Sequence, residues 1–214
     1  MIDPIIITGV PRSRTSMTTA IFKFCGLQLG EVSGPSSNNK KGQFENRDII
    51  DKVEKKHLKL YKFDPMGQFP LPDKLPIDES RKNVVLSILK KQKVNLNKKW
   101  GFKDSKSILS FNSWLHAFPN STWIIVNRDK EDIAKSCQLT PFMKKCKDWT
   151  AFVDAYRKRF EALKKVHNKV YEVDTDEIVN FEFSSIKNVI ESIGLVWNEK
   201  KVKEFVDPNL TRLK

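Results

Sequence analysis

Short apolar runs alternate with longer amphipathic stretches along most of the chain. Ile5, Ile6 and Ile7 form an apolar, β-branched run of the kind found in buried parallel strands. Similar runs predict strands at 4–9, 99–103, 122–127 and 169–173. Apolar residues at helical spacing predict helices at 15–26, 46–60, 79–93, 105–117, 148–167, 183–193 and 198–206. This alternation predicts a three-layer α/β/α fold, with a central parallel sheet of four to five strands and helices on both faces.

Two segments lack a regular pattern. Residues 30–43 are polar and rich in Gly, Ser and Asn. Residues 63–78 contain Pro65, Pro70, Pro72 and Pro76, too many prolines for a regular element. Two interpretations of 63–78 stay open: a mobile lid over an acceptor site and a rigid surface loop.

The loop after the first strand has the features of an anion site. Gly9 and Pro11 end the strand, and a hydroxyl-rich segment, 13–19, leads into a helix. Backbone N–H groups and the helix dipole favour negative charge at such a junction. Arg12 and Arg14 add two positive charges. The sequence therefore predicts a phosphate or sulfate cradle, with a structural turn bearing solvated arginines as the alternative.

This loop does not follow the nucleotide-binding pattern G-x-x-x-x-G-K-[ST]. In the frame that begins at Gly9, Arg14 occupies the position of the second glycine and Thr15 that of the lysine. The lysine that reaches the terminal phosphates is missing, which argues against an ordinary ATP or GTP site and weakens a nucleotide-kinase interpretation.

A second anion-binding position is predicted after the strand at 122–127. Arg128 stands at the carboxyl end of that strand, and Ser136 follows about two helical turns later. Between them, Asp129, Glu131 and Asp132 supply the first-turn acids of a helix. Arg128 and Ser136 could jointly hold a phosphate; the alternative is that Arg128 and Asp129 form a helix-capping pair.

These segments together resemble the sulfotransferase family. Pro11-Arg12-Ser13-Arg14-Thr15-Ser16 is similar to its 5′-phosphosulfate loop, P-[KR]-S-G-T-[ST], and Arg128 with Ser136 matches its 3′-phosphate motif in residue type and spacing. Residues 39–46 resemble an N-P-K-G-[YF]-F-E-N stretch of bacterial-type members, and 100–104 a strand that ends in Lys-Asp or Lys-Thr. The resemblance covers nearly the whole chain. Two departures are Arg14 in place of the loop glycine and the absence of a C-terminal G-x-x-G-x-x-K element.

The resemblance implies a P-loop-NTPase-like fold and a metal-independent reaction. In this reaction a sulfuryl group moves from 3′-phosphoadenosine 5′-phosphosulfate (PAPS) to a hydroxyl or amine acceptor, which leaves 3′-phosphoadenosine 5′-phosphate (PAP). The strands at 4–9 and 122–127 should then be neighbours, since both deliver ligands to one nucleotide. Residues 11–16 would hold the 5′-phosphate, and Arg128 with Ser136 the 3′-phosphate. Arg12 would face the leaving-group oxygen and Lys103 the sulfuryl oxygens, because stabilisation of developing charge dominates such displacements.

The acceptor must lose a proton, so a general base is expected. The histidine that animal cytosolic members place after the strand at 99–103 is missing, since Asp104 and Ser105 stand there. Glu45 is the preferred base because it lies in the family-like 39–46 stretch, with Glu31 and Asp104 as alternatives. The three histidines, His57, His116 and His167, lie within helical patterns and are interpreted as structural or surface residues.

Composition limits the class of protein. The 214 residues, 39% hydrophobic, predict one domain over 1–214, and no stretch approaches the roughly 20 apolar residues of a membrane span. Met1 leads directly into the first strand, which predicts no signal peptide. Three cysteines without metal-binding spacing predict reduced thiols in a cytoplasmic protein.

The net charge of +13 is the one compositional outlier. Its lysines are scattered, and no nucleic-acid-binding motif is present, so capture of a polyanionic donor is favoured over binding of nucleic acid. The competing hypothesis is a basic nucleotide- or nucleic-acid-binding protein without sulfotransfer activity. Small-molecule, glycan and lipid acceptors are all compatible with the sequence, and the oligomeric state is not predicted.

Overall fold

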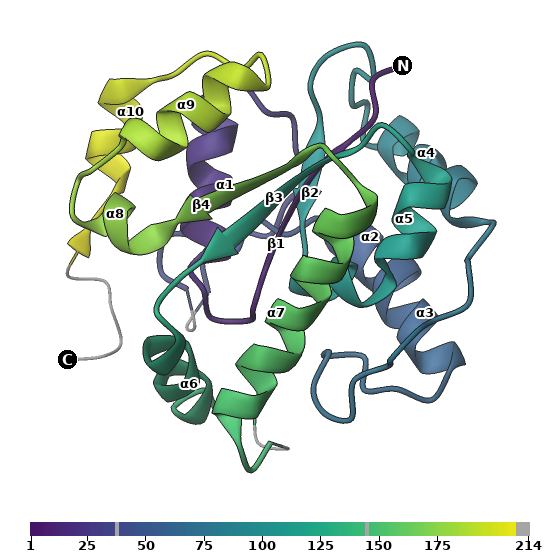
Figure 1. Cartoon of the computed structure of the whole chain (residues 1–214). Helices are drawn as coiled ribbons and strands as arrows, with labels where there is room; N and C mark the ends of the chain where they lie inside the picture. The colour runs from purple at the N-terminus through teal and green to yellow at the C-terminus, as the bar shows by residue number, and fades with distance from the viewer. Residues whose placement is uncertain (37–38, 144–145, 209–214) are drawn as a thin grey trace.

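The computed structural model of the chain describes residues 1–36, 39–143 and 146–208. In this part of the chain a parallel sheet has four strands in the order β2-β1-β3-β4 (Figure 1). The strands are β1 (Ile5–Gly9), β2 (Gly101–Lys103), β3 (Thr122–Asn127) and β4 (Val170–Asp174). The predicted parallel sheet is confirmed.

Strand β1 lies between β2 and β3. Ile7 pairs with Lys103 of β2 and with Ile124 of β3, and Gly9 pairs with Val126. The predicted neighbourhood of the strands at 4–9 and 122–127 is therefore confirmed. Because all these strands run in parallel, the loops that follow them meet at one edge of the sheet.

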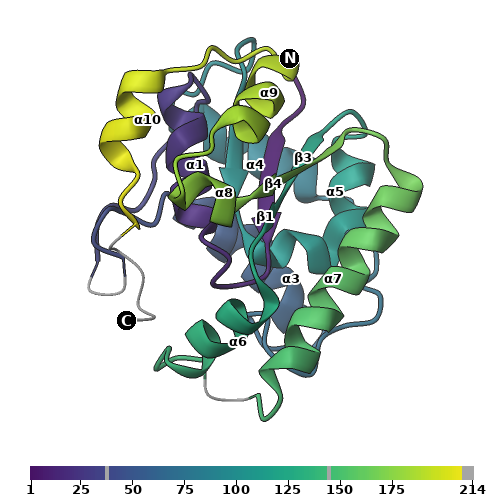
Figure 2. The same ribbon diagram turned by 60° about the vertical axis from the view of Figure 1, so that its left-hand side comes forward.

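Helices cover both faces of the sheet. Side chains alternate along a strand, so Ile6 and Trp123 enter one buried cluster while Ile7 and Ile124 enter another. Residues of α4 (Arg81–Lys91), α5 (Phe111–Ala117) and α7 (Trp149–Val166) belong to the first cluster. Residues of α1 (Thr15–Phe24), α9 (Ser184–Ser192) and α10 (Glu199–Phe205) belong to the second. Figure 2 shows α5 and α7 on one side of the strands and α1, α9 and α10 on the other. The three-layer prediction is confirmed. The other described α-helices are α2 (Arg47–Ile49), α3 (Lys55–Leu60), α6 (Lys130–Gln138) and α8 (Thr175–Val179).

Two predicted helices differ from a regular α-helix. The helix predicted at 46–60 contains a π-helical turn, Ile50–Glu54, between α2 and α3. The helix predicted at 105–117 opens with a 3₁₀ segment, Ser105–Ser110, before α5 begins. Asp104 is the N-cap residue of this segment, and its carboxylate accepts a hydrogen bond from the backbone N–H of Lys106 at 3.1 Å. An Asp at this position satisfies a backbone N–H that has no partner within the helix.

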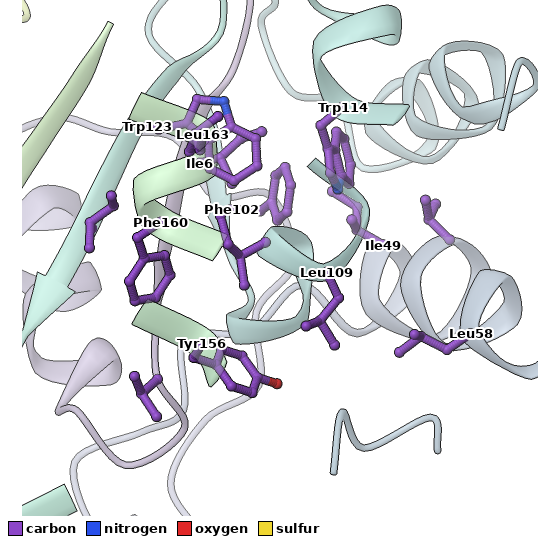
Figure 3. Packing of buried hydrophobic residues seen from close by; sticks show 14 of the residues in the cluster. Ile6, Ile49, Leu58, Phe102, Leu109, Trp114, Trp123, Tyr156, Phe160 and Leu163 are labelled. Carbon is purple, nitrogen blue, oxygen red and sulfur yellow. The ribbon is translucent and has the colours of Figure 1, made fainter. Parts of the chain in front are cut away.

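Several large aromatic side chains lie in the larger cluster. Figure 3 shows Phe102, Trp114 and Trp123 among its members. The ring centroids of Phe102 and Trp114 lie 4.6 Å apart, and this contact packs α5 against β2. No helix in the described ranges has the length and apolar character needed to cross a bilayer.

A buried charge cluster links the two irregular helical segments. Glu54 of the π-helical turn accepts hydrogen bonds from Arg81 at 3.1 Å, from Ser110 at 2.9 Å and from the indole of Trp114. Arg81 also donates to Nδ1 of His57 at 2.8 Å, which makes this histidine structural, as expected. Burial and the charge of Arg81 lower the pKa of His57. The cluster fixes the π-helical turn against the 3₁₀ segment, and both segments border the site.

Candidate functional site

A cavity of about 650 Å³ lies where the loops after the parallel strands meet, a volume in the range of small-molecule sites. Residues that follow β1, β2, β3 and β4 all contribute to its wall. Among the described lining residues, nine basic side chains face three acidic ones. The basic residues are Arg12, Arg14, Lys40, Lys41, Arg47, Lys55, Lys103, Lys106 and Arg128. Such a cavity attracts anions.

The loop after β1 turns sharply into the N-terminus of α1. Arg12 and Arg14 both have left-handed backbone conformations, with φ of 78° and 63°. Arg14 is the N-cap residue of α1, so the first N–H groups of the helix follow it directly. Gly9 has to be a glycine, because a Cβ there would lie 2.5 Å from Oγ of Ser13 and 2.8 Å from the carbonyl oxygen of Val126. This geometry supports the predicted anion cradle.

Arg14 holds the conformation that glycine adopts without strain. Its guanidinium forms an ion pair with Asp176 at the start of α8. A left-handed non-glycine residue costs about 1–3 kcal/mol, whereas a partly exposed ion pair contributes about 0–1 kcal/mol. Arg14, in place of the loop glycine, therefore introduces backbone strain, and its ion pair with Asp176 connects α1 to α8.

We expect Arg14→Gly to leave the free energy of unfolding within about 1 kcal/mol of the wild type. Relief of strain is offset by the lost ion pair together with the greater backbone freedom of glycine in the unfolded chain. Arg14→Ala, which loses the ion pair but keeps Cβ, should be less stable than Arg14→Gly by about 1 kcal/mol. Urea unfolding of both variants measures the difference. Equal stability, or a more stable alanine variant, would contradict the strained assignment.

Arg12, Ser136 and Arg128 form one connected group. Nε of Arg12 donates to Oγ of Ser136 at 3.1 Å, and Nη1 of Arg128 donates to the carbonyl oxygen of Arg12 at 3.1 Å. Nη2 of Arg128 donates to Asp132 at 2.9 Å, one helical turn further on. The structure thus brings the two predicted anion-binding motifs together.

The Arg128 guanidinium uses only some of its hydrogen-bond donors. Its Nε is buried and has no hydrogen-bond partner among the residues that the structure describes. Burial and the nearby charge of Arg14 lower the pKa of Arg128 from its ordinary value, yet arginine stays charged. A buried cation with an unused donor is suited to an anion such as phosphate.

Lys103 and Glu45 meet beside the same loop. Lys103 ends β2, and its Nζ donates to Glu45 at 2.8 Å and to Oγ of Ser16 at 3.3 Å. Burial acts to raise the pKa of Glu45, but the charges of Lys103, Lys106 and Arg47 outweigh it, so the pKa is lowered. Glu45 is therefore ionised at neutral pH.

Asp104 and Lys106 form a buried ion pair at the start of the 3₁₀ segment. Nζ of Lys106 donates to Oδ1 of Asp104 at 2.5 Å, and both residues line the cavity. Oδ2 of Asp104 is buried and has no partner among the described residues. Burial raises the pKa of Asp104, although Lys106 opposes the rise.

The predicted residues divide clearly by position. Pro11, Arg12, Arg14, Thr15, Ser16, Glu45, Lys103, Asp104, Arg128 and Ser136 line the cavity. Ser13 is fully buried behind the loop, where its N–H donates to the carbonyl oxygen of Val10 at 3.0 Å. Glu31, an alternative base, is exposed and lies outside the cavity wall; its N–H donates to Gln92 at 3.0 Å.

The sequence did not identify Lys106 or Gln68, which also line the cavity. The signal for Lys106 is its place two residues after Asp104, at a strand end where side chains meet ligands. Gln68 lies in the proline-rich segment 63–78, where no periodicity marks inward positions. That segment is anchored by hydrogen bonds from Tyr156 to Gly67 at 2.8 Å and from Gln68 to Phe142 at 3.1 Å, which favours the rigid-loop interpretation.

No protein-family model matches the sequence, and no curated protein matches it. Among solved structures, the chain is similar to the sulfotransferase domain of the Synechococcus PCC 7002 olefin synthase, with a TM-score of 0.56, 14% identity and coverage of 100% of this chain and 85% of that one. It is similar to the sulfotransferase STF9 from Mycobacterium avium, with a TM-score of 0.56, 12% identity and coverage of 95% and 67%. It is also similar to the sulfotransferase domain of the curacin biosynthetic pathway, with a TM-score of 0.55, 11% identity and coverage of 97% and 78%.

At these identities the comparison establishes the fold. The chain has the P-loop-like α/β fold of sulfotransferases, as the motif resemblance implied. In the described residues no group of three or more His, Cys, Asp or Glu side chains could hold a metal ion.

Proposed function

We propose that this protein is a sulfotransferase that moves a sulfuryl group from PAPS to an acceptor hydroxyl. One observation supports the proposal: a single cavity brings together two groups of residues that are suited to anions. The first is the loop after β1 with the N-terminus of α1, and the second is Arg128 with Ser136; Arg12 contacts both Arg128 and Ser136. A nucleotide with phosphates on both its 5′ and 3′ positions matches this pair, whereas AMP and ATP lack the 3′-phosphate.

The donor would be held mainly by charge and by backbone donors. N–H groups of 14–16, with the hydroxyls of Thr15 and Ser16, would bind the 5′-phosphate at the positive end of α1. The N–H of Ser13, also expected there, already donates to the carbonyl oxygen of Val10. Arg128 would bind the 3′-phosphate through a charge-assisted contact. Lys40 and Lys41 also line the cavity, and they are candidates to supply the charge of the missing C-terminal element.

The transfer itself is an in-line displacement. The bond between sulfur and the 5′-phosphate oxygen breaks, a bond forms between sulfur and the acceptor oxygen, and the acceptor proton leaves. Charge develops on the leaving oxygen and on the sulfuryl group, so fixed cations at those positions lower the barrier. We assign Arg12 to the leaving oxygen and Lys103 to the sulfuryl oxygens.

Glu45 is the preferred proton acceptor. Its carboxylate is ionised and lies 2.8 Å from Nζ of Lys103, the group assigned to the sulfuryl oxygens. Asp104 also lines the cavity and is the competing candidate.

Cys25, Cys137 and Cys146 are free thiols, which supports a reducing, cytoplasmic setting.

We expect PAP to bind more tightly than AMP and Arg128→Ala to remove most of that preference. A charge-assisted contact to the 3′-phosphate is worth about 1.5–3 kcal/mol. Isothermal titration calorimetry with both nucleotides measures the preference in the wild type and the variant. If Arg128→Ala weakens the binding of PAP and of AMP equally, the assignment of Arg128 to the 3′-phosphate is wrong.

A further inference from the structure

One part of the cavity wall is built by two segments far apart in the sequence. Met66 and Gln68 come from the proline-rich segment 63–78, and Phe142 and Met143 come from the turn after α6. Gln68 joins the two segments, because its Nε2 donates to the carbonyl oxygen of Phe142 at 3.1 Å. This wall combines apolar side chains with one buried amide.

The wall packs directly on the 3₁₀ segment. The carbonyl oxygen of Gly67 accepts a hydrogen bond from Tyr156 at 2.8 Å. A Cβ at Gly67, which has a φ of +69°, would lie 2.9 Å from Cγ of Lys106. Gln68 is therefore adjacent to the segment that carries Lys106 and Asp104.

The amide of Gln68 leaves a hydrogen-bond acceptor unused. The carbonyl of Phe142 can only accept, so the amide nitrogen must face it, and Oε1 points elsewhere. Gln68 is 3% exposed, and its Oε1 has no partner among the residues that the structure describes. An unsatisfied buried acceptor is costly, so a donor from a bound molecule would be favourable here.

A second residue that lines the same cavity, Asp104, also has an unused acceptor. Oδ2 of Asp104 is buried and has no partner within the described ranges, and Asp104 is 1% exposed. If Glu45 takes the proton of the reacting hydroxyl, the oxygens of Gln68 and Asp104 need donors from other groups. A compound with a single hydroxyl cannot supply them.

The charged side chains in the rest of the cavity decide which donor groups fit. Four basic side chains, those of Arg47, Lys55, Lys103 and Lys106, line the cavity with Glu45 and Asp104. An ammonium group would meet this excess of positive charge, whereas neutral hydroxyls would not. The unused oxygens are therefore suited to hydroxyl donors.

We propose that this wall binds the acceptor and that Gln68 selects a polyhydroxy compound of carbohydrate type; the proposal rests on the sulfotransferase function proposed above. The reacting hydroxyl lies near Glu45 and Lys103. Other hydroxyls of the same molecule donate to Oε1 of Gln68 and Oδ2 of Asp104. Met66, Phe142 and Met143 contact its C–H surfaces.

The test compares three acceptors that share one alkyl chain: octyl β-glucoside, 1-octanol and octylamine. Transfer from radiolabelled PAPS to each is measured for the wild type, for Gln68→Met and for Gln28→Met. Gln28 lies outside the cavity wall, so the third protein controls for the substitution itself. Affinity of each acceptor for the PAP-saturated wild type is measured by calorimetry, which does not depend on turnover.

We expect the wild type and Gln28→Met to prefer the glucoside over 1-octanol by about tenfold or more in kcat/KM, with octylamine poorest. Gln68→Met should reduce the glucoside preference by about tenfold while PAP affinity stays unchanged. No preference for the glucoside in either transfer or binding, or a preference that survives Gln68→Met, would overturn the proposal. If PAP binds but the glucoside is not preferred, only the proposed class of acceptor is overturned. If PAP does not bind, the proposed sulfotransferase function itself is overturned.

Discussion

Arg12→Ala should lower turnover about 10²–10³-fold, the usual cost of removing one donor that stabilises developing charge. PAP affinity should change far less, because the charge on the leaving oxygen is largest in the transition state. The structure supports this role, since Arg12 lines the cavity and is oriented by its 3.1 Å hydrogen bond to Ser136. Single-turnover kinetics with radiolabelled PAPS and calorimetry with PAP separate the two quantities.

Arg12→Lys is the matched control. Lysine keeps the positive charge and is the residue that the family pattern also allows, so this variant should retain most of the activity. The assignment would fail if turnover and PAP affinity fell in parallel in Arg12→Ala, since Arg12 would then bind the ground state and the transition state equally.

Glu45→Gln is expected to lower turnover about 10²–10⁴-fold, the usual contribution of a positioned general base. The amide keeps the shape of the side chain but cannot take a proton, so PAP affinity should stay nearly unchanged. Glu31→Gln, at an exposed position outside the cavity wall, is the control and should keep full activity. Full activity in Glu45→Gln would move the role of base to Asp104.

The pH profile gives an independent check on Glu45. The base acts when deprotonated, and the neighbouring cations lower its pKa below the ordinary glutamate value despite burial. kcat/KM should therefore hold as the pH falls toward that ordinary value and decline only below it. Asp104 has a raised pKa, so a decline above the ordinary carboxyl range would favour Asp104 instead.

The sheet and the anion loop could be predicted because local patterns determine them. Three β-branched residues, 5–7, suffice to indicate a buried parallel strand. Gly9 marks the end of that strand, and its close contact with Val126 requires a glycine. Arg128 and Ser136 were predicted together because their spacing along one strand and helix is short. Such signals need no knowledge of distant contacts.

Other parts of the site depend on contacts between distant segments. The ion pair of Lys103 with Glu45 joins residues 58 positions apart, and the pairing of β2 with β1 places Lys103 beside Ile7. The place of Gln68 follows from a hydrogen bond to Phe142, 74 residues further on, within a segment that has no periodic pattern. The sequence also left Glu31 and Glu45 as competing bases, and only the tertiary structure separates their positions.

The affinity of the wild type for PAP relative to AMP is the direct test of whether the protein binds a nucleotide with both a 5′- and a 3′-phosphate. Isothermal titration calorimetry under one salt condition compares PAP, AMP, ATP and duplex DNA. We expect PAP to bind about 10–150-fold more tightly than AMP, which corresponds to about 1.5–3 kcal/mol from the 3′-phosphate. ATP and DNA should bind less tightly than PAP. Equal affinities for PAP and AMP, or tighter binding of ATP or DNA, would rule out PAPS as the donor.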